Sequence, residues 1–273
     1  NWIDTAAIYG GGASEELVKR ALGESPPAER PLVATKCGRL MQADGTAAAC
    51  LKKDSVVAEC EASLKRLGTE CIDLYQLHWP QPDEDIEEAW SALVELKQAG
   101  KVRAIGVSNH TVGQLKRLQA IHPVASLQPP YSMIDRSVEE EILPFCGRES
   151  IGVVCYSPMA KGLLTGGFSR ERVEALPEND HRRSKDPQFA SPRLEANLAL
   201  VEAIRPIAEK HGRPLAQFAI AWTLRRPEVT SAIVGVRRAA QIAETAGAGD
   251  WELAPEELEL IRKALQQRDD LIG

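Results

Sequence analysis

The sequence lacks the features that mark two broad classes of protein. No apolar run approaches the ~20 residues that a membrane-spanning helix needs. The net charge is −6, and basic residues gather only in pairs such as Arg182–Arg183 and Arg225–Arg226, whereas nucleic-acid phosphates require clustered cations. We therefore expect neither a membrane nor a nucleic acid among the partners of this chain.

Cysteine motifs are also missing. The six cysteines form no C-x-x-C pair, and no Cys/His cluster has zinc-finger spacing. We expect reduced, structural thiols in a cytoplasmic protein and no metal site. Four histidines are expected to be solvated or to cap helices: His110, His122, His181 and His211.

The glycine fingerprint of doubly wound dinucleotide-binding folds is absent, because no G-x-G-x-x-G follows a strand-like run. What is present is a regular alternation of short β-rich runs with longer helical patterns. This alternation, without linkers, predicts one α/β domain over residues 1–273 with a mainly parallel sheet. The expected strands are residues 2–5, 32–36, 72–78, 102–108, 124–128, 151–156 and 231–236.

Capping residues mark several expected helix starts. Ser14 is a good N-cap, and Thr111 with Gln114 has the pattern of a capping box. Ser137 with Glu140 has the same pattern, so we expect a helix to begin there as well.

Polar side chains gather where the expected strands end. Lys36 closes an apolar run, and a buried lysine needs a partner because an unpaired buried charge is costly. Asp4 supplies a plausible carboxylate, and Tyr9 follows it by five residues. His78 closes another strand, whereas Asp73, in the middle of that strand, is expected to form a structural salt bridge.

Asp4, Tyr9, Lys36 and His78 together are suited to proton transfer. A phenol with a pKa near ~10 is a poor acid at neutral pH, but a nearby ammonium lowers that pKa. A carboxylate can hold the ammonium in place, and an imidazole can orient a carbonyl oxygen.

The segments that carry these residues resemble the aldo-keto reductase family. The resemblance runs essentially end to end, in the family's order. It is carried by residues 1–10 (NWIDTAAIYG), 34–36 (ATK), 72–80 (IDLYQLHWP), 100–109 (GKVRAIGVSN) and 156–158 (YSP). It implies a (β/α)8 TIM barrel that binds NADP(H) or NAD(H) without a Rossmann motif.

The resemblance assigns roles to single residues. Tyr9 matches the general acid, Lys36 the neighbour that lowers its pKa, Asp4 the partner of Lys36, and His78 the residue that orients the carbonyl. The implied reaction is hydride transfer from NADPH to the carbonyl of an aldehyde or ketone, with reversible alcohol oxidation.

The implied cofactor-binding residues fall into two groups. The nicotinamide group is Ser108, Asn109, Gln128 and Tyr156, with Ser157 beside the stacking ring. The second group begins with Leu163, in a long loop (residues 163–193) that resembles the segment over the pyrophosphate, and continues in the adenosine-phosphate segment with Gly235, Arg237, Arg238, Gln241, Glu244 and Thr245. Thr245 stands where many members of the family have Asn.

An arginine beside the adenosine segment suits a 2′-phosphate, so we expect NADP(H) rather than NAD(H). Family members carry a further strand and helix, and a small hairpin, ahead of the strand with Asp4. Seven expected strands instead of eight, and Asn1 instead of Met, suggest a partial sequence that lacks the first β/α unit.

Two other interpretations remain open at this point. One is a cofactor-binding regulatory subunit, because potassium-channel β-subunits share the fold and the four residues. The other is an inactive fragment with an open barrel. The sequence leaves the identity of the carbonyl substrate and the oligomeric state open.

Overall fold

The computed structural model describes residues 1–26 and 29–273. The chain divides into two compact units, which are described separately. Unit 1 comprises Asn1–Pro129 and Pro144–Val153, and unit 2 comprises Pro130–Leu143 and Val154–Gly273. The prediction of one domain over residues 1–273 stays a prediction.

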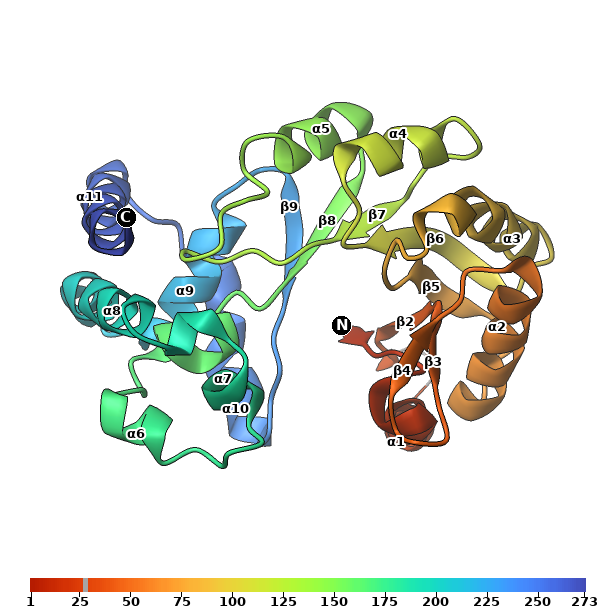
Figure 1. The fold of residues 1–273 in the computed structure, drawn as a ribbon, viewed down its shortest axis with the longest axis horizontal. Coiled ribbons are helices and arrows are strands. Elements are labelled where there is room, and N and C mark those ends of the chain that lie inside the picture. Colours follow the sequence, from red (N-terminus) through yellow and green to blue (C-terminus); the bar gives the residue numbers. More distant parts are fainter. Residues whose placement is uncertain (27–28) are drawn as a thin grey trace. The chain divides into compact units, whose positions relative to one another are not determined.

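Unit 1 alternates strands and helices, as the sequence pattern predicts (Figure 1). Its elements in chain order are β1 (Trp2–Asp4), η1 (Tyr9–Gly12), α1 (Ala13–Gly23), β2 (Leu32–Cys37), β3 (Arg39–Met41), β4 (Ala47–Ala49), α2 (Lys53–Leu67), β5 (Ile72–Leu77), η3 (Asp83–Asp85), α3 (Ile86–Gln98), β6 (Val102–Ser108), α4 (Val112–Gln119) and β7 (Ser126–Gln128).

Two elements, α5 (Ile142–Glu149) and β8 (Gly152–Tyr156), have residues in both units. Unit 2 is mainly helical. Its elements are η4 (Ala160–Thr165), α6 (Arg170–Glu174), α7 (His181–Ser184), η5 (Pro187–Phe189), α8 (Arg193–Lys210), α9 (Leu215–Leu224), β9 (Val229–Ile233), α10 (Ala239–Ala246), η6 (Gly247–Asp250) and α11 (Pro255–Ile272).

Seven strands form one sheet in the order β1-β2-β5-β6-β7-β8-β9, and the pairs from β1 to β8 are parallel. This order follows the sequence, so each strand pairs with the next one along the chain, apart from the small hairpin β3–β4. A helix follows most strands, which is the connection that parallel neighbours require. The carboxyl ends of β1, β2, β5, β6 and β7 therefore meet at one edge of unit 1.

The sheet of unit 1 is covered by helices α2 and α3, which lie side by side (Figure 1). Trp90 and Leu93 of α3 are fully buried, as are Val56 and Cys60 of α2. Asp73 binds Arg103 at 3.0 Å and also accepts a hydrogen bond from the Val33 amide, which confirms its predicted salt bridge.

The capping predictions have mixed outcomes. Thr111 and Gln114 form the expected capping box of α4. Ser14 is not an N-cap: α1 begins at Ala13 after Gly12, and the Ser14 hydroxyl lies 2.7 Å from that of Thr5. No helix begins at Ser137, whose hydroxyl donates to Asp135; the next helix, α5, begins at Ile142.

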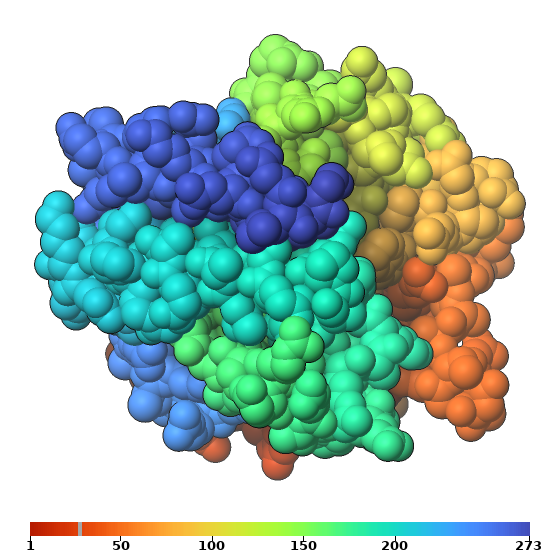
Figure 2. Space-filling model, turned by 60° about the vertical axis from the view of Figure 1, so that its left-hand side comes forward, coloured from red at the N-terminus to blue at the C-terminus, as the bar shows by residue number. Residues whose placement is uncertain are grey.

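Helices α8 and α11 lie side by side in unit 2 (Figure 1 and Figure 2). Ile204 of α8 and Ile261 of α11 are buried, so each helix directs an apolar stripe inward. The expected loop from 163 to 193 instead contains four short helical segments. Among the described residues, no helix is long and apolar enough to cross a membrane.

Gly106 occupies a crowded position in β6, between Gln76 of β5 and Ser126 of β7. A Cβ atom at Gly106 would lie 2.3 Å from the Ser126 hydroxyl oxygen and 2.8 Å from the Ser126 carbonyl oxygen. The carbonyl belongs to the backbone of the neighbouring strand, so relief of this clash requires the two strands to separate.

We expect Gly106→Ala to lower the free energy of unfolding by about 1–3 kcal/mol, the usual effect of overpacking a core. Gly113→Ala is the matched control, because Gly113 lies in helix α4 and a Cβ atom there would meet only the Thr111 hydroxyl oxygen, at an ordinary contact distance of 3.9 Å. Alanine there should raise the free energy of unfolding by about 0.5–1 kcal/mol. Urea unfolding of the three proteins measures both changes, and equal stability of Gly106→Ala and wild type would contradict the clash.

Candidate active site

A buried ion pair lies at the carboxyl ends of β1 and β2. The Lys36 Nζ atom lies 2.5 Å from Oδ1 of Asp4, and the two side chains are 0% and 7% exposed. The ammonium also donates to the Thr5 carbonyl oxygen at 2.9 Å. The partner that the sequence predicted for Lys36 is therefore present. Burial lowers the pKa of Lys36, and the neighbouring Asp4 carboxylate opposes that shift.

Tyr9 lies next to this pair, at the start of the short helix η1 that follows β1. The Lys36 Nζ atom is 5.4 Å from the centre of the Tyr9 ring. Tyr9 is 43% exposed, whereas Lys36 is buried. The cation and the ring are thus close enough to interact electrostatically.

His78 completes the set from the end of β5. Its ring meets the Tyr9 ring edge-on, with 5.8 Å between the centres. Burial lowers the pKa of His78 to about 4, and the positive charges of Lys36 and Arg39 add to that effect. The imidazole is therefore neutral at physiological pH and can offer one N–H group to a carbonyl oxygen.

A second cluster, at the ends of β6 and β7, is joined to the ion pair. The Ser108 hydroxyl donates to the Gln128 carbonyl oxygen at 2.8 Å, and the Asn109 amide donates to the carbonyl oxygen of His78 at 3.1 Å. Asn109 has φ = 63°, a left-handed conformation that asparagine tolerates better than most residues.

The Gln128 side chain reaches the carboxylate of Asp4. Its Nε2 atom donates to Oδ2 of Asp4 at 2.8 Å, so both oxygens of that carboxylate are hydrogen-bonded. This contact joins residues 124 positions apart. The sequence placed Gln128 only among the cofactor-binding residues, so the link to Asp4 is a finding of the structure.

His110 is buried and does not cap or face solvent, contrary to the sequence-based expectation. It is 2% exposed, its Nδ1 atom bonds the Ser108 carbonyl oxygen at 2.8 Å, and its Nε2 atom is buried without a partner among the residues that the structure describes. Burial lowers its pKa to about 4. Because this value lies below the ordinary 6.5, folding favours the neutral ring and the native state resists protonation.

His110 should therefore destabilise the fold as the solution is acidified. This destabilisation is absent above pH 6.5 and grows as the pH falls. At pH 4 it lowers the free energy of unfolding by about 3 kcal/mol. Between pH 7 and pH 5, the free energy of unfolding of His110→Gln should fall by about 2 kcal/mol less than that of wild type. Urea unfolding at both pH values measures this difference, and parallel losses in the two proteins would show that His110 is not responsible.

Unit 2 contains a cavity of about 1040 Å³ that gathers most of the remaining predicted residues. Tyr156, the last residue of β8, and Ser157 line it, and a second part of the lining follows β9. The predicted residues in that second part are Gly235, Arg237, Arg238, Gln241, Glu244 and Thr245. Leu163 is fully buried and does not line the cavity, so its predicted contact with the cofactor is not apparent from its side chain.

The loop after β9 has the character of an anion site. Strand β9 ends at Ile233, earlier than the predicted end at Val236, so the segment from Val234 to Val236 lines the cavity. The amides of Arg237 and Arg238 donate to Oε1 of Gln241 at 2.8 and 3.1 Å, which fixes the loop against the N-terminus of α10. Neither guanidinium forms an ion pair within the described part of the chain.

Other charged side chains at this cavity were not predicted individually. Arg182 binds Asp180 through two hydrogen bonds of 2.9 and 2.6 Å and lies over the Phe168 ring. Lys161 donates to Asp186 at 2.6 Å. Asp180, Arg182 and Asp186 lie in the expected loop from 163 to 193, whereas Lys161 precedes it.

The cavity fits a dinucleotide. Its volume is at the upper end of the usual range for ligand sites, it has an aromatic residue at one part of its lining, and it has two guanidinium groups beside a helix N-terminus.

No cluster of three or more potential metal ligands occurs in the described residues. All six cysteines are free thiols.

Comparison with known proteins agrees with this chemistry. A model of the Aldo/keto reductase family matches residues 1–266. Aldo-keto reductase YhdN of Bacillus subtilis is 36% identical over 265 residues, which are 97% of this chain and 79% of that protein.

Solved structures give the same result. A glycerol dehydrogenase from Gluconobacter oxydans superposes with a TM-score of 0.92 at 35% identity, over 98% of this chain and 81% of the other. The holo form of aldo-keto reductase AKR11C1 from Bacillus halodurans has a TM-score of 0.79 at 28% identity, over 97% and 82%. The predicted α/β barrel fold class is confirmed, and the comparisons lend no support to a regulatory subunit or an inactive fragment. The chain belongs to the aldo/keto reductase family of nicotinamide-dependent carbonyl oxidoreductases.

Proposed function

We propose that this enzyme reduces aldehydes or ketones with NADPH and that Tyr9 donates the proton. The observation that carries this proposal is the buried Lys36–Asp4 ion pair beside the Tyr9 ring. NADPH, when bound, supplies the hydride that reduces the carbonyl carbon. The chain supplies the groups that bind the carbonyl oxygen and protonate it.

The geometry and charge of these groups support the roles that we propose for them. Tyr9 is the exposed member of the set and donates its hydroxyl proton to the carbonyl oxygen. The Lys36 ammonium stabilises the phenolate that remains, and Asp4 holds that ammonium in place. His78, neutral because of its low pKa, donates an N–H group that orients the carbonyl.

Gln128 has a positioning role in this proposal, because its amide holds the second carboxylate oxygen of Asp4. Ser108 and Asn109 lie in the same hydrogen-bonded cluster and are proposed to hold the nicotinamide carboxamide. Tyr156 is proposed to stack on the nicotinamide ring in unit 2.

The preference for NADPH over NADH is proposed to come from Arg237 and Arg238. Both are exposed and unpaired within the described part of the chain, so a 2′-phosphate would gain charge-assisted hydrogen bonds without displacing an ion pair. Gln241 fixes the loop that carries them, and Glu244 and Thr245 line the same cavity.

We expect Arg237→Ala and Arg238→Ala each to weaken NADPH binding by about tenfold to a hundredfold, the usual effect of losing a hydrogen bond to a charged group. Binding of NADH, which lacks the 2′-phosphate, should change less than threefold. Fluorescence titration of both cofactors measures the two constants. If both cofactors weakened equally, the arginines would not recognise the 2′-phosphate.

Absorbance of NADPH and NADH during incubation with a panel of aldehydes and ketones tests the proposed activity. Glycerol belongs in the panel for the reverse direction, because a similar protein is described as a glycerol dehydrogenase. Oxidation of NADPH by at least one carbonyl compound is the expected result, and no turnover with any of them would contradict the proposal.

A further inference from the structure

One cation beside His78 has no carboxylate partner within the described part of the chain. Arg39 opens the short strand β3, two residues after β2 ends at Cys37. The backbone amide of His78 donates to the Cys37 carbonyl oxygen at 3.0 Å, so the two segments are joined. The charge of Arg39 contributes to the low pKa of His78, which places the guanidinium near the imidazole. These residues all belong to unit 1, as do Tyr9 and Lys36.

Two residues that follow His78 hold the guanidinium of Arg39. Its Nη2 atom donates to Oε1 of Gln81 at 3.0 Å, and its Cζ atom lies 5.8 Å from the centre of the Trp79 ring. Both partners are neutral, so they orient the guanidinium without cancelling its charge. Its remaining N–H groups have no partner among the residues that the structure describes.

The carboxylates of this region are bound to other groups. Asp4 pairs with Lys36 at 2.5 Å, so the second cation near His78 is already neutralised. Glu59 accepts a hydrogen bond from the Gly38 amide at 3.0 Å, and its side chain forms no ion pair with a guanidinium in the described residues. The positive charge of the guanidinium is therefore left uncompensated.

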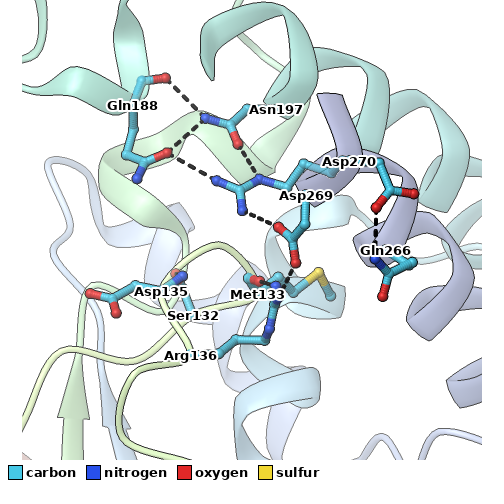
Figure 3. A network of polar contacts seen from close by, with 10 residues as sticks. Ser132, Met133, Asp135, Arg136, Gln188, Asn197, Gln266, Asp269 and Asp270 are labelled. Atoms are coloured by element: carbon cyan, nitrogen blue, oxygen red, sulfur yellow. Dashed lines mark hydrogen bonds and ion pairs between the residues drawn. The ribbon is translucent and has the colours of Figure 1, made fainter. Parts of the chain in front are cut away.

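Other arginines of the chain show the usual arrangement, in which a carboxylate balances the guanidinium. In unit 2, Arg136 and Arg268 both bind Asp269 (Figure 3). Arg39 is half-buried, so its charge is partly removed from water without such a partner. An anion that reached it would gain charge-assisted hydrogen bonds and would displace no carboxylate of the chain.

A guanidinium that is oriented and unpaired is suited to carboxylate and phosphate groups, because its planar set of N–H donors matches their oxygens. Arg39 contacts the two residues that lie just beyond His78, the residue proposed to orient the carbonyl. We propose that Arg39 binds an anionic group of the substrate, so that the enzyme favours aldehydes and ketones that carry a carboxylate or a phosphate. This inference rests on the proposed reductase function.

The test uses two pairs of aldehydes whose members differ in an anionic group. The first pair is 4-oxobutanoate and butanal, and the second is glyceraldehyde 3-phosphate and glyceraldehyde. Wild type should have a kcat/KM about tenfold or more higher for the anionic member of at least one pair, mainly through a lower KM. The pair that shows this preference identifies the bound group as a carboxylate or a phosphate.

Arg39→Met keeps an unbranched side chain and removes its charge. It should lower the ratio of kcat/KM for the anionic member to kcat/KM for the neutral member by about tenfold or more. Arg39→Lys keeps the charge and should retain part of the ratio. Arg103→Met is the matched control, because Arg103 lies near the amino end of β6 and binds Asp73, so this variant should keep the ratio of wild type.

Charge reversal keeps the proposal testable if Arg39→Met folds poorly. In Arg39→Glu, kcat/KM for the cationic betaine aldehyde should rise about fivefold relative to that for butanal, because attraction replaces repulsion. A folding defect would lower both values and would not produce such a gain.

The other outcomes overturn the inference. Reduction of butanal and glyceraldehyde by wild type without any preference for their anionic partners would contradict the inference alone. An unchanged ratio in Arg39→Met, an equal fall of the ratio in Arg103→Met, or no relative gain for betaine aldehyde in Arg39→Glu would show that Arg39 does not bind the anionic group. No reduction of any of these aldehydes with NADPH or NADH would contradict the proposed function and, with it, the inference.

Discussion

Replacement of Tyr9 by phenylalanine is expected to lower kcat for carbonyl reduction by about 10²- to 10⁴-fold, the range that general acid catalysis contributes. The substitution removes one hydroxyl group and leaves the aromatic ring, which contacts His78 edge-on and lies near Lys36. Because Tyr9 is 43% exposed, the fold should tolerate the change. The loss should therefore appear in the chemical step.

Two controls separate proton donation from other effects of this substitution. NADPH affinity, measured by fluorescence titration, should stay within about threefold of wild type, because the proposed cofactor contacts do not include the Tyr9 hydroxyl. Tyr75→Phe is a matched control, since Tyr75 is a fully buried tyrosine of β5 outside the proposed mechanism. Full activity of Tyr9→Phe, or an equal loss in Tyr75→Phe, would remove Tyr9 from the mechanism.

Lys36→Met is expected to affect both stability and rate. Removal of the ammonium leaves the Asp4 carboxylate, 7% exposed, without its cation, and the loss of one partner of a buried pair costs about 3–5 kcal/mol. Gln128 still donates to that carboxylate, so we expect a loss of stability in the lower part of this range. The rate should fall by at least about 10²-fold, because the phenolate of Tyr9 loses its stabilising cation.

The double variant Asp4→Asn, Lys36→Met separates these two effects. It removes the unpaired charge, so it should regain part of the stability that Lys36→Met loses. It should not regain activity, because the ammonium is still missing. Urea unfolding and steady-state rates measure the two quantities, and recovery of the rate in the double variant would contradict the role of Lys36.

The sequence predicts best those site residues that lie at the ends of strands. In parallel strands that follow one another, polar residues at the carboxyl ends must meet at one edge. Lys36 was recognisable because a lysine in an apolar strand demands a partner, and Asp4 was the carboxylate in a corresponding position. The resemblance to a known family then supplied the roles of the individual residues.

Contacts between distant side chains escaped the sequence analysis. The hydrogen bond from Gln128 to Asp4 depends on the register of several strands, which no local pattern encodes. The burial of His110 depends on the same packing, whereas its sequence neighbours are polar. The short hairpin β3–β4 is not among the expected strands. One of its strands is Ala47–Ala49, and alanine has little preference for strands.

Local capping patterns failed where another partner was available. The hydroxyl of Ser14 lies against that of Thr5, and the hydroxyl of Ser137 donates to Asp135. In both cases the serine side chain that could cap a helix makes a different contact. Thr111 forms its capping box because Gln114 lies three residues on and completes it.

The central claim is that this chain reduces a carbonyl carbon with hydride from a nicotinamide. Deuterium labelling tests it most directly. NADPH that carries deuterium at both hydrogen positions of the carbon that donates the hydride is incubated with the enzyme and an aldehyde that it reduces, and the alcohol is analysed by mass spectrometry. We predict one deuterium on the former carbonyl carbon of the product. An alcohol without deuterium at that carbon would contradict the account.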